Sequence, residues 1–315
     1  EWFRDIGVTA ITVSSLSMAQ QFANSGWDNI MIAVPFNPHQ TPQFLELAST
    51  VQLHLITDSL SALEGLISYL PTHSTTRLYI WAEVDTGHHR TGIPWQHIDD
   101  IRFIFDRIQS IPQLQCGGIL THAGQTYHSE DIDDINHIYA DSVSKLVHIQ
   151  DRLFSVGHQV PISFGDTPSC STQSAFSGIH DIRPGNFIFF DVMQTKIGSC
   201  TLDDIAIAVA CPIISTHPDR LQWVIHGGSA HLSKESVVIQ GKPCYGKVSF
   251  FSSTDSLLWA PPQEHTYVCE LSQEHGIIQC TPDDFPKHGV GDAIAILPIH
   301  ACATVNLLKP HLTIL

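Results

Sequence analysis

Short apolar runs alternate with longer segments of helical periodicity over residues 10–190. The runs are rich in β-branched and aliphatic side chains, and their centres are Ile11, Met31, Leu53, Tyr79, Ile119, Ile162 and Phe189. Between the first two runs, serines precede a helix that ends at Gly26, and one face of this helix carries Leu16, Ala19, Phe22 and Ala23. Residues 99–111 repeat this spacing. Alternating strands and helices predict a parallel sheet covered by helices.

The periodicity changes after residue 194. Strand-like runs at residues 205–210, 222–225, 248–251, 266–271 and 293–297 are separated by glycine, proline, aspartate and serine, with no long amphipathic segment between them. This pattern predicts an all-β domain. The expected architecture is therefore an α/β barrel over residues 1–194, followed by a mainly antiparallel β domain over residues 195–315.

The first domain contains seven predicted strands, whereas a closed (β/α)8 barrel of the TIM type needs eight. Residues 1–7 have the pattern of the last turns of a helix, with Trp2, Phe3 and Ile6 apolar and Gly7 at its end. A strand is expected before such a helix. We therefore expect the first barrel strand to be missing from this sequence and to precede Glu1.

Composition and charge limit the classes of partner and the cellular compartment that we expect for this chain. The chain has 315 residues and a formal net charge of −16, so a nucleic acid is not an expected partner. The longest apolar run, residues 205–215, is too short for a membrane helix and contains a proline. The first residues do not resemble a secretory signal, and the eight cysteines are scattered singly. We expect a cytoplasmic protein with reduced thiols.

Glycine-rich polar loops follow several predicted strands of the barrel, at the end where such barrels carry their active sites. They read VDTGHHRTG (residues 84–92), THAGQTYH (121–128), SFGDTPSC (163–170) and IRPGNF (182–187). Glycine lets backbone N–H groups approach an anion, and Thr167 or Asn186 could add side-chain donors, so the loops favour phosphate binding without a lysine. Arg90 and Arg183 suit a carboxylate or phosphate, but each could instead be a surface charge.

A second candidate site lies near the end of the β domain. If the extended conformation continues past Pro298, His300 and Cys302 point to the same face. An imidazole and a thiolate favour Zn²⁺ and would leave positions open for water, a third ligand or a substrate. Core packing is the alternative for this pair, and also for a second polar pair, Glu274 and His275.

Together and in this order, these loops resemble the D-serine dehydratase and D-threonine aldolase family of pyridoxal-phosphate enzymes, as do HGGSAHLSK (226–234), SQEHG (272–276) and LPIHACATVNL (297–307). The resemblance covers residues 7–307 and implies the alanine-racemase-like fold, called fold type III. The cofactor residues it implies are His122 near the ring, Tyr127 and Thr167 in contact with the cofactor, Gly185 and Asn186 at its phosphate, and Arg90 and Arg183 beside ring or substrate. The zinc ligands it implies are His300 and Cys302.

The resemblance also implies an activity. It suggests a dehydratase that uses pyridoxal phosphate and zinc to convert a D-amino acid with a β-hydroxyl, such as D-serine, into a 2-oxo acid and ammonia. D-threonine aldolase or amino-acid racemase activity is the alternative within the family, and a thiolate at position 302 favours the dehydratase over the aldolase. The implied partners are this small-molecule substrate and a second copy of the chain in a homodimer.

One residue that the resemblance requires is not found. Members of the family hold the cofactor through a lysine of the first barrel strand, and none of the lysines here occupies such a place: Lys145, Lys196, Lys234, Lys242, Lys247, Lys287 and Lys309. We therefore expect the lysine to precede Glu1 with the missing strand, and the chain as written to bind cofactor weakly and catalyse nothing. A non-catalytic cofactor-binding protein, or a structural barrel with zinc, is the alternative of another class.

Overall fold

The chain forms two compact units. The computed structural model describes residues 2–73, 75–253, 256–309 and 313. Unit 1 comprises residues 1–126 and 133–184, and unit 2 comprises residues 127–132 and 185–315. Each unit has its own apolar core. The expected domain division after residue 194 stays a prediction.

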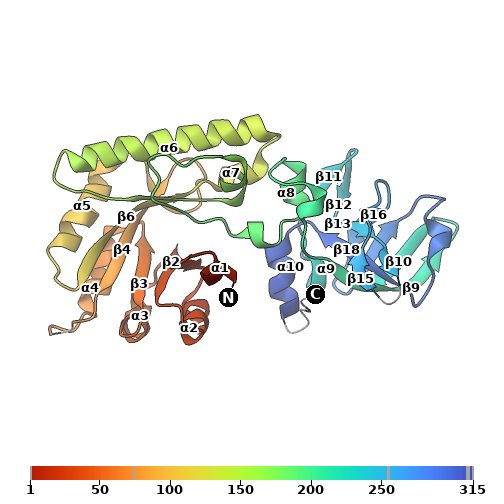
Figure 1. Cartoon of the computed structure of the whole chain (residues 1–315), viewed down its shortest axis with the longest axis horizontal. Coiled ribbons are helices and arrows are strands. Elements are labelled where there is room, and N and C mark those ends of the chain that lie inside the picture. Colours follow the sequence, from red (N-terminus) through yellow and green to blue (C-terminus); the bar gives the residue numbers. More distant parts are fainter. Residues whose placement is uncertain (1, 74, 254–255, 310–312, 314–315) are drawn as a thin grey trace. The chain divides into compact units, whose positions relative to one another are not determined.

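Unit 1 contains a parallel sheet with helices around it (Figure 1). The strand order is β1-β2-β3-β4-β6-β7-β8, and the short β5 pairs with β4. The strands are β1 (Ile11–Val13), β2 (Asn29–Pro35), β3 (Gln52–Thr57), β4 (Leu78–Asp85), β5 (Ile93–Pro94), β6 (Leu114–His122), β7 (Ile162–Gly165) and β8 (Asp181–Ile182). The helices are α1 (Trp2–Asp5), α2 (Leu16–Asn24), α3 (Thr41–Ala48), α4 (Leu60–Ser68), α5 (Ile98–Gln109), α6 (Ile132–Phe154) and α7 (Thr167–Thr172).

Both faces of this sheet carry apolar side chains. Alternate residues of a strand point to opposite faces. Ile32, Ile80 and Ile119 belong to the large cluster that packs against the helices. Their sequence neighbours on the other face, among them Met31, Trp81 and Leu120, form a separate small cluster with Ile56. A sheet buried on both faces is the arrangement of a barrel with helices outside, as the sequence predicted.

One predicted strand of unit 1 is misplaced. The run around Phe189 is not a strand, because residues Asn186–Ile188 form a 3-10 turn and Phe190 has a φ of +48°. The seventh parallel strand is instead β8, whose two residues pair with Ser163 and Phe164 of β7. Apolar composition alone misled the assignment, since Phe189 and Phe190 are half-buried side chains of a loop.

Unit 2 is built on a closed antiparallel barrel, which confirms the predicted β domain. Its strand order is β10-β17-β16-β13-β18-β9, and Trp223, Ile225, Val248 and Ile296 lie in its core. The barrel strands are β9 (Val209–His217), β10 (Gln222–His226), β13 (Gly246–Ser249), β16 (Tyr267–Leu271), β17 (His275–Gln279) and β18 (Ala293–Pro298). Two small hairpins pair β11 (Val237–Ile239) with β12 (Lys242–Cys244), and β14 (Phe251–Ser253) with β15 (Ser256–Trp259).

Three short helices accompany this barrel, and none of them was predicted. They are α8 (Val192–Lys196), α9 (Ser229–Leu232) and α10 (Ala301–Leu308). The run at residues 205–210 is only partly a strand, because β9 begins at Val209. Among the described residues no helix is both long and apolar enough to cross a membrane.

Candidate functional site

Polar side chains gather where three neighbouring strands of unit 1 end. Glu83 and Asp85 lie at the end of β4, His122 ends β6, and Asp166 follows β7. Because β4, β6 and β7 are parallel neighbours, their carboxyl ends share one edge of the sheet. Active sites of barrel enzymes occur at this edge.

His122 is a neutral base in this group. Burial lowers the pKa of its imidazole to about 3, and the positive charges of Arg90 and Arg183 lower it further, as does His88. The His88 ring meets the His122 ring edge-on, with centroids 5.6 Å apart. An uncharged imidazole suits contact with an aromatic ring. Because both arginines affect the pKa of His122, Arg90 and Arg183 lie close enough to His122 to interact with it electrostatically.

Arg183 is held by neutral groups. Its Nε donates to Ser163 Oγ at 2.6 Å, and its Nη2 donates to the carbonyl of Thr121 at 2.6 Å. The guanidinium lies over Gly165, where a Cβ atom would be 2.9 Å from Nη1. Glycine at this position is therefore needed for the arginine to reach across the strand ends. Arg90, in contrast, is exposed.

Glu83 is a buried carboxylate that the sequence analysis missed. It is 4% exposed, its Oε1 accepts from Thr91 Oγ1 at 3.0 Å, and its Oε2 has no hydrogen-bond partner among the described residues. Burial raises the pKa of this carboxyl, and the charge of Asp58 adds to the effect. Gln125 Oε1 is likewise buried and unpaired within the described chain. Such atoms are costly to bury, so they favour a polar ligand at this edge.

Thr167 begins helix α7 and is fully buried. The preceding residue, Asp166, caps the helix by accepting from the Ser169 N–H at 2.6 Å, and it also accepts from Thr126 Oγ1 at 3.0 Å. Burial raises the pKa of Asp166 to about 6. The loop SFGDTPSC is therefore a helix start that carries Thr167 at the same edge as His122.

In unit 2, Asp191 connects the candidate phosphate loop with the candidate metal ligands. Gly185 has no atom within 4 Å of where a Cβ would lie, so the backbone there is open. Asn186 Nδ2 donates to Asp191 Oδ2 at 2.6 Å, and the same oxygen accepts from the Ala301 N–H at 2.9 Å. Because Ala301 lies between His300 and Cys302, one buried carboxylate orients both groups. The sequence analysis missed Asp191.

His300 and Cys302 are brought together, but not as a strand would do it. The strand ends at Pro298, His300 is the N-cap of α10 with φ −129° and ψ 101°, and Cys302 lies in the first turn of that helix. The expected extended conformation past Pro298 is wrong, because the chain becomes helical at Ala301. The two side chains still meet, and a hydrogen bond with Cys302 is the largest cause that raises the pKa of His300 to about 9.

Glu235 completes this group. Its Oε2 lies 2.6 Å from His300 Nδ1, which leaves the other ring nitrogen for a metal. An imidazole oriented by a carboxylate, next to an exposed thiol, is a donor set that fits Zn²⁺. Glu235 was not predicted, because only the fold brings the segment LSKES (residues 232–236) near residue 300.

The predicted site residues thus fall into two groups. Arg90, His122, Thr167 and Arg183 belong to unit 1 and lie at one edge of its sheet. Those in unit 2 are Tyr127, Gly185, Asn186, His300 and Cys302. Asp191 unites Asn186 with the metal pair, and Tyr127 is half-buried in the 3-10 turn Gly124–His128.

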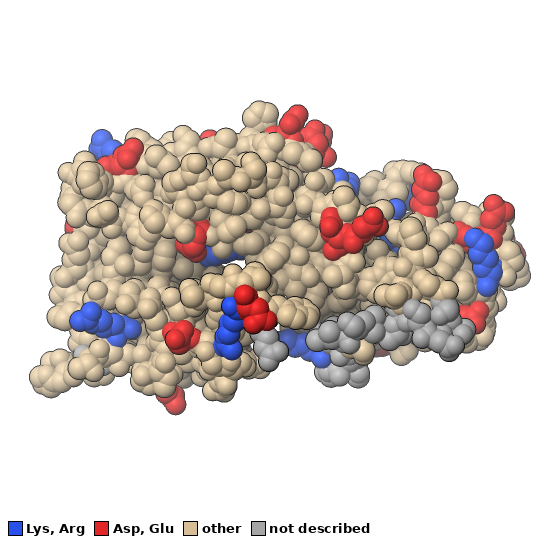
Figure 2. Space-filling view, in the orientation of Figure 1, with Lys and Arg blue, Asp and Glu red and all other residues tan. Residues whose placement is uncertain are grey.

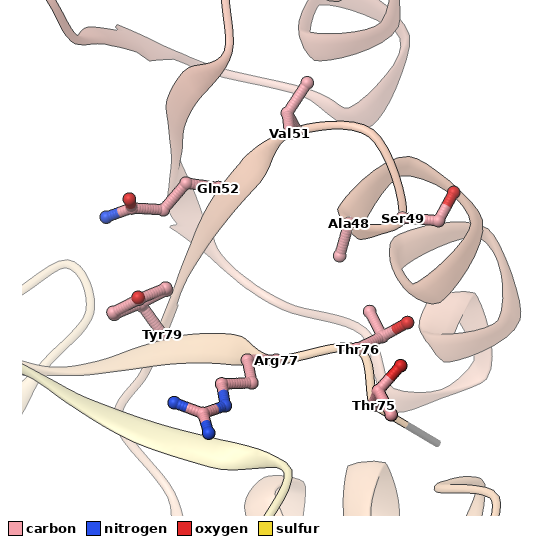
Figure 3. Close-up of a pocket in the computed structure, with 8 residues that line it drawn as sticks. All are labelled: Ala48, Ser49, Val51, Gln52, Thr75, Thr76, Arg77 and Tyr79. Atoms are coloured by element: carbon pink, nitrogen blue, oxygen red, sulfur yellow. The ribbon is translucent and has the colours of Figure 1, made fainter.

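A shallow pocket elsewhere on unit 1 does not contain these residues (Figure 3). It is lined by Gln52 and Tyr79, near the starts of β3 and β4, and by Ser49, Thr75 and Arg77. It therefore lies at the amino-terminal end of the strands. Residues at that end of a barrel usually serve stability, whereas those at the carboxyl end serve chemistry.

Comparison with known families agrees with this geometry. Residues 3–192 match the family model described as "Alanine racemase, N-terminal domain". The chain belongs to this family. Residues 206–314 match a second model, described as "Putative serine dehydratase domain". The two matches together confirm the resemblance to the D-serine dehydratase and D-threonine aldolase family.

Two relatives are similar over almost the whole chain. The D-threo-3-hydroxyaspartate dehydratase of Delftia sp. (strain HT23) is 27% identical over 96% of this chain and 79% of its own length. The D-serine dehydratase of Dictyostelium discoideum is 26% identical over 96% of this chain and 78% of its own length. The structure of the Delftia enzyme superposes with a TM-score of 0.87, over 96% of this chain and 80% of that one.

Other solved structures define the fold and hint at a metal. The D-threonine aldolase of Filomicrobium marinum superposes with a TM-score of 0.79 at 18% identity, covering 96% of this chain and 77% of that one, which supports the alanine-racemase-like fold alone. Structures of D-threo-3-hydroxyaspartate dehydratase are also known with a histidine replaced by alanine, and with the cysteine two positions further on replaced by alanine, the latter in a metal-free form.

Proposed function

We propose that this chain forms the main part of a pyridoxal-phosphate-dependent dehydratase, a lyase that converts a D-amino acid with a β-hydroxyl, such as D-serine, into a 2-oxo acid and ammonia. The observation that carries the proposal is the pair His300 and Cys302 held beside Asn186 by Asp191, within a chain related throughout to named dehydratases. The same arrangement supports a metal next to a cofactor phosphate.

Five residues are proposed to hold the cofactor. Gly185 and Asn186 would bind its phosphate through an open backbone and an oriented amide. His122, which is neutral and half-buried, would lie against the ring, and Thr167 and Tyr127 would contact it. When bound, pyridoxal phosphate supplies an electron sink for the bond broken at the α-carbon.

The chain's own residues then prepare the substrate end of the site. Arg183, fixed by Ser163 and Thr121, would bind the substrate carboxylate in a set direction. Glu83, whose pKa burial raises, offers a buried carboxyl able to hold a proton near the strand ends. Glu235 holds the His300 ring in one orientation.

The proposed metal is zinc, bound by His300 and Cys302. A bound zinc ion supplies a Lewis acid for the β-hydroxyl, which makes hydroxide a better leaving group. The spacing of this pair is that of the histidine and cysteine replaced in the D-threo-3-hydroxyaspartate dehydratase variants, one of which is metal-free. A thiolate ligand favours zinc over Mg²⁺ or Mn²⁺ and thus the dehydratase over the aldolase.

The activity is tested on the full-length natural protein supplied with pyridoxal phosphate and zinc. We expect a 2-oxo acid and ammonia in equal amounts from D-serine and none from L-serine. Glycine and an aldehyde from D-threonine would establish the aldolase instead, and interconversion of D- and L-isomers would establish a racemase. Cofactor binding without turnover of any of these amino acids would identify a non-catalytic binding protein.

Zinc content tests the metal separately. His300→Ala and Cys302→Ala are each expected to remove one equivalent of zinc, whereas Cys116→Ala, which replaces another exposed cysteine, should remove none. Unaltered zinc content in both site variants refutes this assignment.

The remaining parts of the proposal concern the assembly and compartment. We propose a cytoplasmic homodimer in which both subunits contribute residues near the site, and no nucleic acid or membrane partner. On the face shown in Figure 2, the lysine and arginine side chains are separated rather than joined in a basic stripe. Sedimentation of the full-length protein as a monomer at assay concentration would contradict the dimer.

A further inference from the structure

A second group of metal-binding side chains lies in unit 2 and shares no residue with the site described above. It consists of His226, His231 and Glu274, whose candidate ligand atoms all lie within 4.8 Å of one another. His226 Nε2 is 3.7 Å from Glu274 Oε2, and His231 Nε2 is 3.9 Å from the same oxygen. We propose that these three residues form a second zinc site.

The ligand set is one that zinc takes in proteins. Two imidazoles and one carboxylate bind zinc through three protein ligands and leave a fourth position for water. Ligand atoms around a tetrahedral zinc ion lie about 3.3–3.5 Å apart. The two distances to Glu274 Oε2 need to close by only a few tenths of an ångström. The two imidazole nitrogens, which lie within 4.8 Å of each other, need to close by about 1.4 Å at most, which rotation of the exposed His226 side chain provides. The side chains of His226 and Glu274 are 55% and 47% exposed, so an ion can reach them.

The backbone that carries these side chains is already fixed. His226 ends β10, His231 lies in α9, and Glu274 lies in the turn between β16 and β17. Three backbone hydrogen bonds join the first segment to that turn: Gly227 N–H to the Glu274 carbonyl at 3.1 Å, Ser229 N–H to Ser272 at 2.8 Å, and Ala230 N–H to Gln273 at 3.0 Å. The ligands therefore need no folding step to meet.

Gly228 shows how close the two segments lie. A Cβ atom at this position would be 2.4 Å from the Gln273 carbonyl oxygen and 2.5 Å from that of Ser272. Only glycine permits this approach, which brings the segment that carries His226 and His231 against the turn that carries Glu274. The close approach is a packing feature of the backbone and is independent of the side-chain distances.

The side chain of Glu274 is also oriented from outside the group. Gln273 Nε2 donates to Glu274 Oε1 at 3.1 Å, so Oε2 is the oxygen turned toward the two imidazoles. The rings of His226 and His231 stand edge-on, with centroids 5.2 Å apart. A carboxylate held by an outer amide is the kind of support that ligands of metal sites have.

One hydrogen bond within this group opposes zinc binding and lowers the expected affinity. The Gly228 N–H donates to His231 Nδ1 at 3.3 Å, whereas zinc at Nε2 of a neutral imidazole requires the proton on Nδ1. This long hydrogen bond must therefore open when zinc binds, which lowers affinity by about tenfold. The formal net charge of −16 favours cation binding and acts in the opposite direction.

The test uses the full-length protein with both His300→Ala and Cys302→Ala, so that the first site cannot contribute. Equilibrium dialysis against a series of Zn²⁺ concentrations is expected to show one equivalent bound. Adding His226→Ala or Glu274→Gln should abolish that equivalent. His226 is well exposed, so its replacement should leave folding intact. Binding curves that superimpose on the parent curve, or no zinc bound by the parent, would overturn the proposal.

The control is His265→Ala. His265 Nε2 lies 3.8 Å from Glu264 Oε1, a comparable distance in the same unit, but within the described part of the chain this pair has no third metal-binding side chain. Its replacement should leave zinc binding unchanged, and loss of zinc there would overturn the assignment. Co²⁺ gives a second readout. In the parent it should produce visible bands without the sulfur charge-transfer band of a cysteine ligand, and the presence of that band would also overturn the assignment.

Discussion

Replacing Asp191 by alanine is expected to destabilise unit 2 and to weaken zinc binding at the proposed site of His300 and Cys302. The side chain is fully buried and accepts hydrogen bonds from Asn186 Nδ2 at 2.6 Å, from the Ala301 N–H at 2.9 Å and from the Gln194 N–H at 3.0 Å. Alanine leaves all three donors without their acceptor in a place that excludes water. Ala301 lies between His300 and Cys302, the proposed zinc ligands, so stability and zinc affinity should fall together.

The magnitude follows from the three bonds. Loss of the helix cap at Gln194 costs about 1 kcal/mol, and each buried donor left unpaired costs about 1–3 kcal/mol. Part of this is offset, because burial raises the pKa of Asp191 and its charged form is therefore costly to bury. We expect the free energy of unfolding to fall by about 3 kcal/mol. Asp191→Asn keeps an oxygen for the two donors at Oδ2 and should cost about 1 kcal/mol.

Two assays check this on the full-length protein. Urea unfolding gives the free-energy change, and native-state hydrogen exchange at the amides of Ala301 and Gln194 shows whether the loss is local. Competition with a chelator should show zinc affinity reduced about tenfold in the alanine variant. Asp203→Ala, an exposed aspartate without a hydrogen bond among the described residues, is the control. The reasoning is refuted if alanine at 191 costs less than about 0.5 kcal/mol, or no more than asparagine.

Three further predictions concern unit 1. Burial raises the pKa of Asp166 from 3.8 to about 6, so the folded state binds more protons than the unfolded state between these values, and stability should fall by about 3 kcal/mol as pH rises through that window. Asp166→Asn should remove this fall, and an unchanged pH profile of urea unfolding would contradict it. His122 has the opposite sign: its folded pKa of about 3 lies below the ordinary 6.5, so stability should fall as pH drops from 6.5 to 3, and its NMR ring signals should not titrate between pH 5 and 8. Gly118→Ala should lower the free energy of unfolding by about 3 kcal/mol or more, because Gly118 has a φ of +146° and a Cβ there would be 2.4 Å from the Pro161 carbonyl oxygen. The control is Gly289→Ala, which has open space around it and should cost almost nothing. Equal melting temperatures for the two variants would contradict this prediction.

The amino-acid sequence by itself determined the local elements. Helix α2 is capped by Ser15 and followed by Gly26 in the left-handed region, as its pattern predicted. Six of the seven predicted parallel strands lie where the apolar runs placed them, because burial on both faces requires continuous apolar residues. The glycine-rich loops marked the carboxyl ends of strands, since such turns need glycine to bring polar groups close together.

The sequence was less reliable where an element is short or ends in a loop. The two residues of β8 are strand only because β7 lies beside them, and the apolar run at Phe189 is a turn. Helix α10 replaced an expected strand end, because the continuous apolar run over residues 293–298 does not show where the extended conformation stops. Each of these depends on a partner outside the segment.

Only the tertiary structure decided which polar residues act together. Asp191 meets Ala301 across 110 positions of sequence, and Glu235 meets His300 across the β domain. In the sequence Glu83 is a single acidic residue within an apolar strand, and only the structure shows that its carboxylate is buried. His226 and His231 meet Glu274 because backbone hydrogen bonds hold the turn after β10 against the turn before β17. Periodicity is a local property of a chain, whereas a site is made by contacts between residues far apart along it, so the sequence predicted the elements and folding alone brought their side chains together.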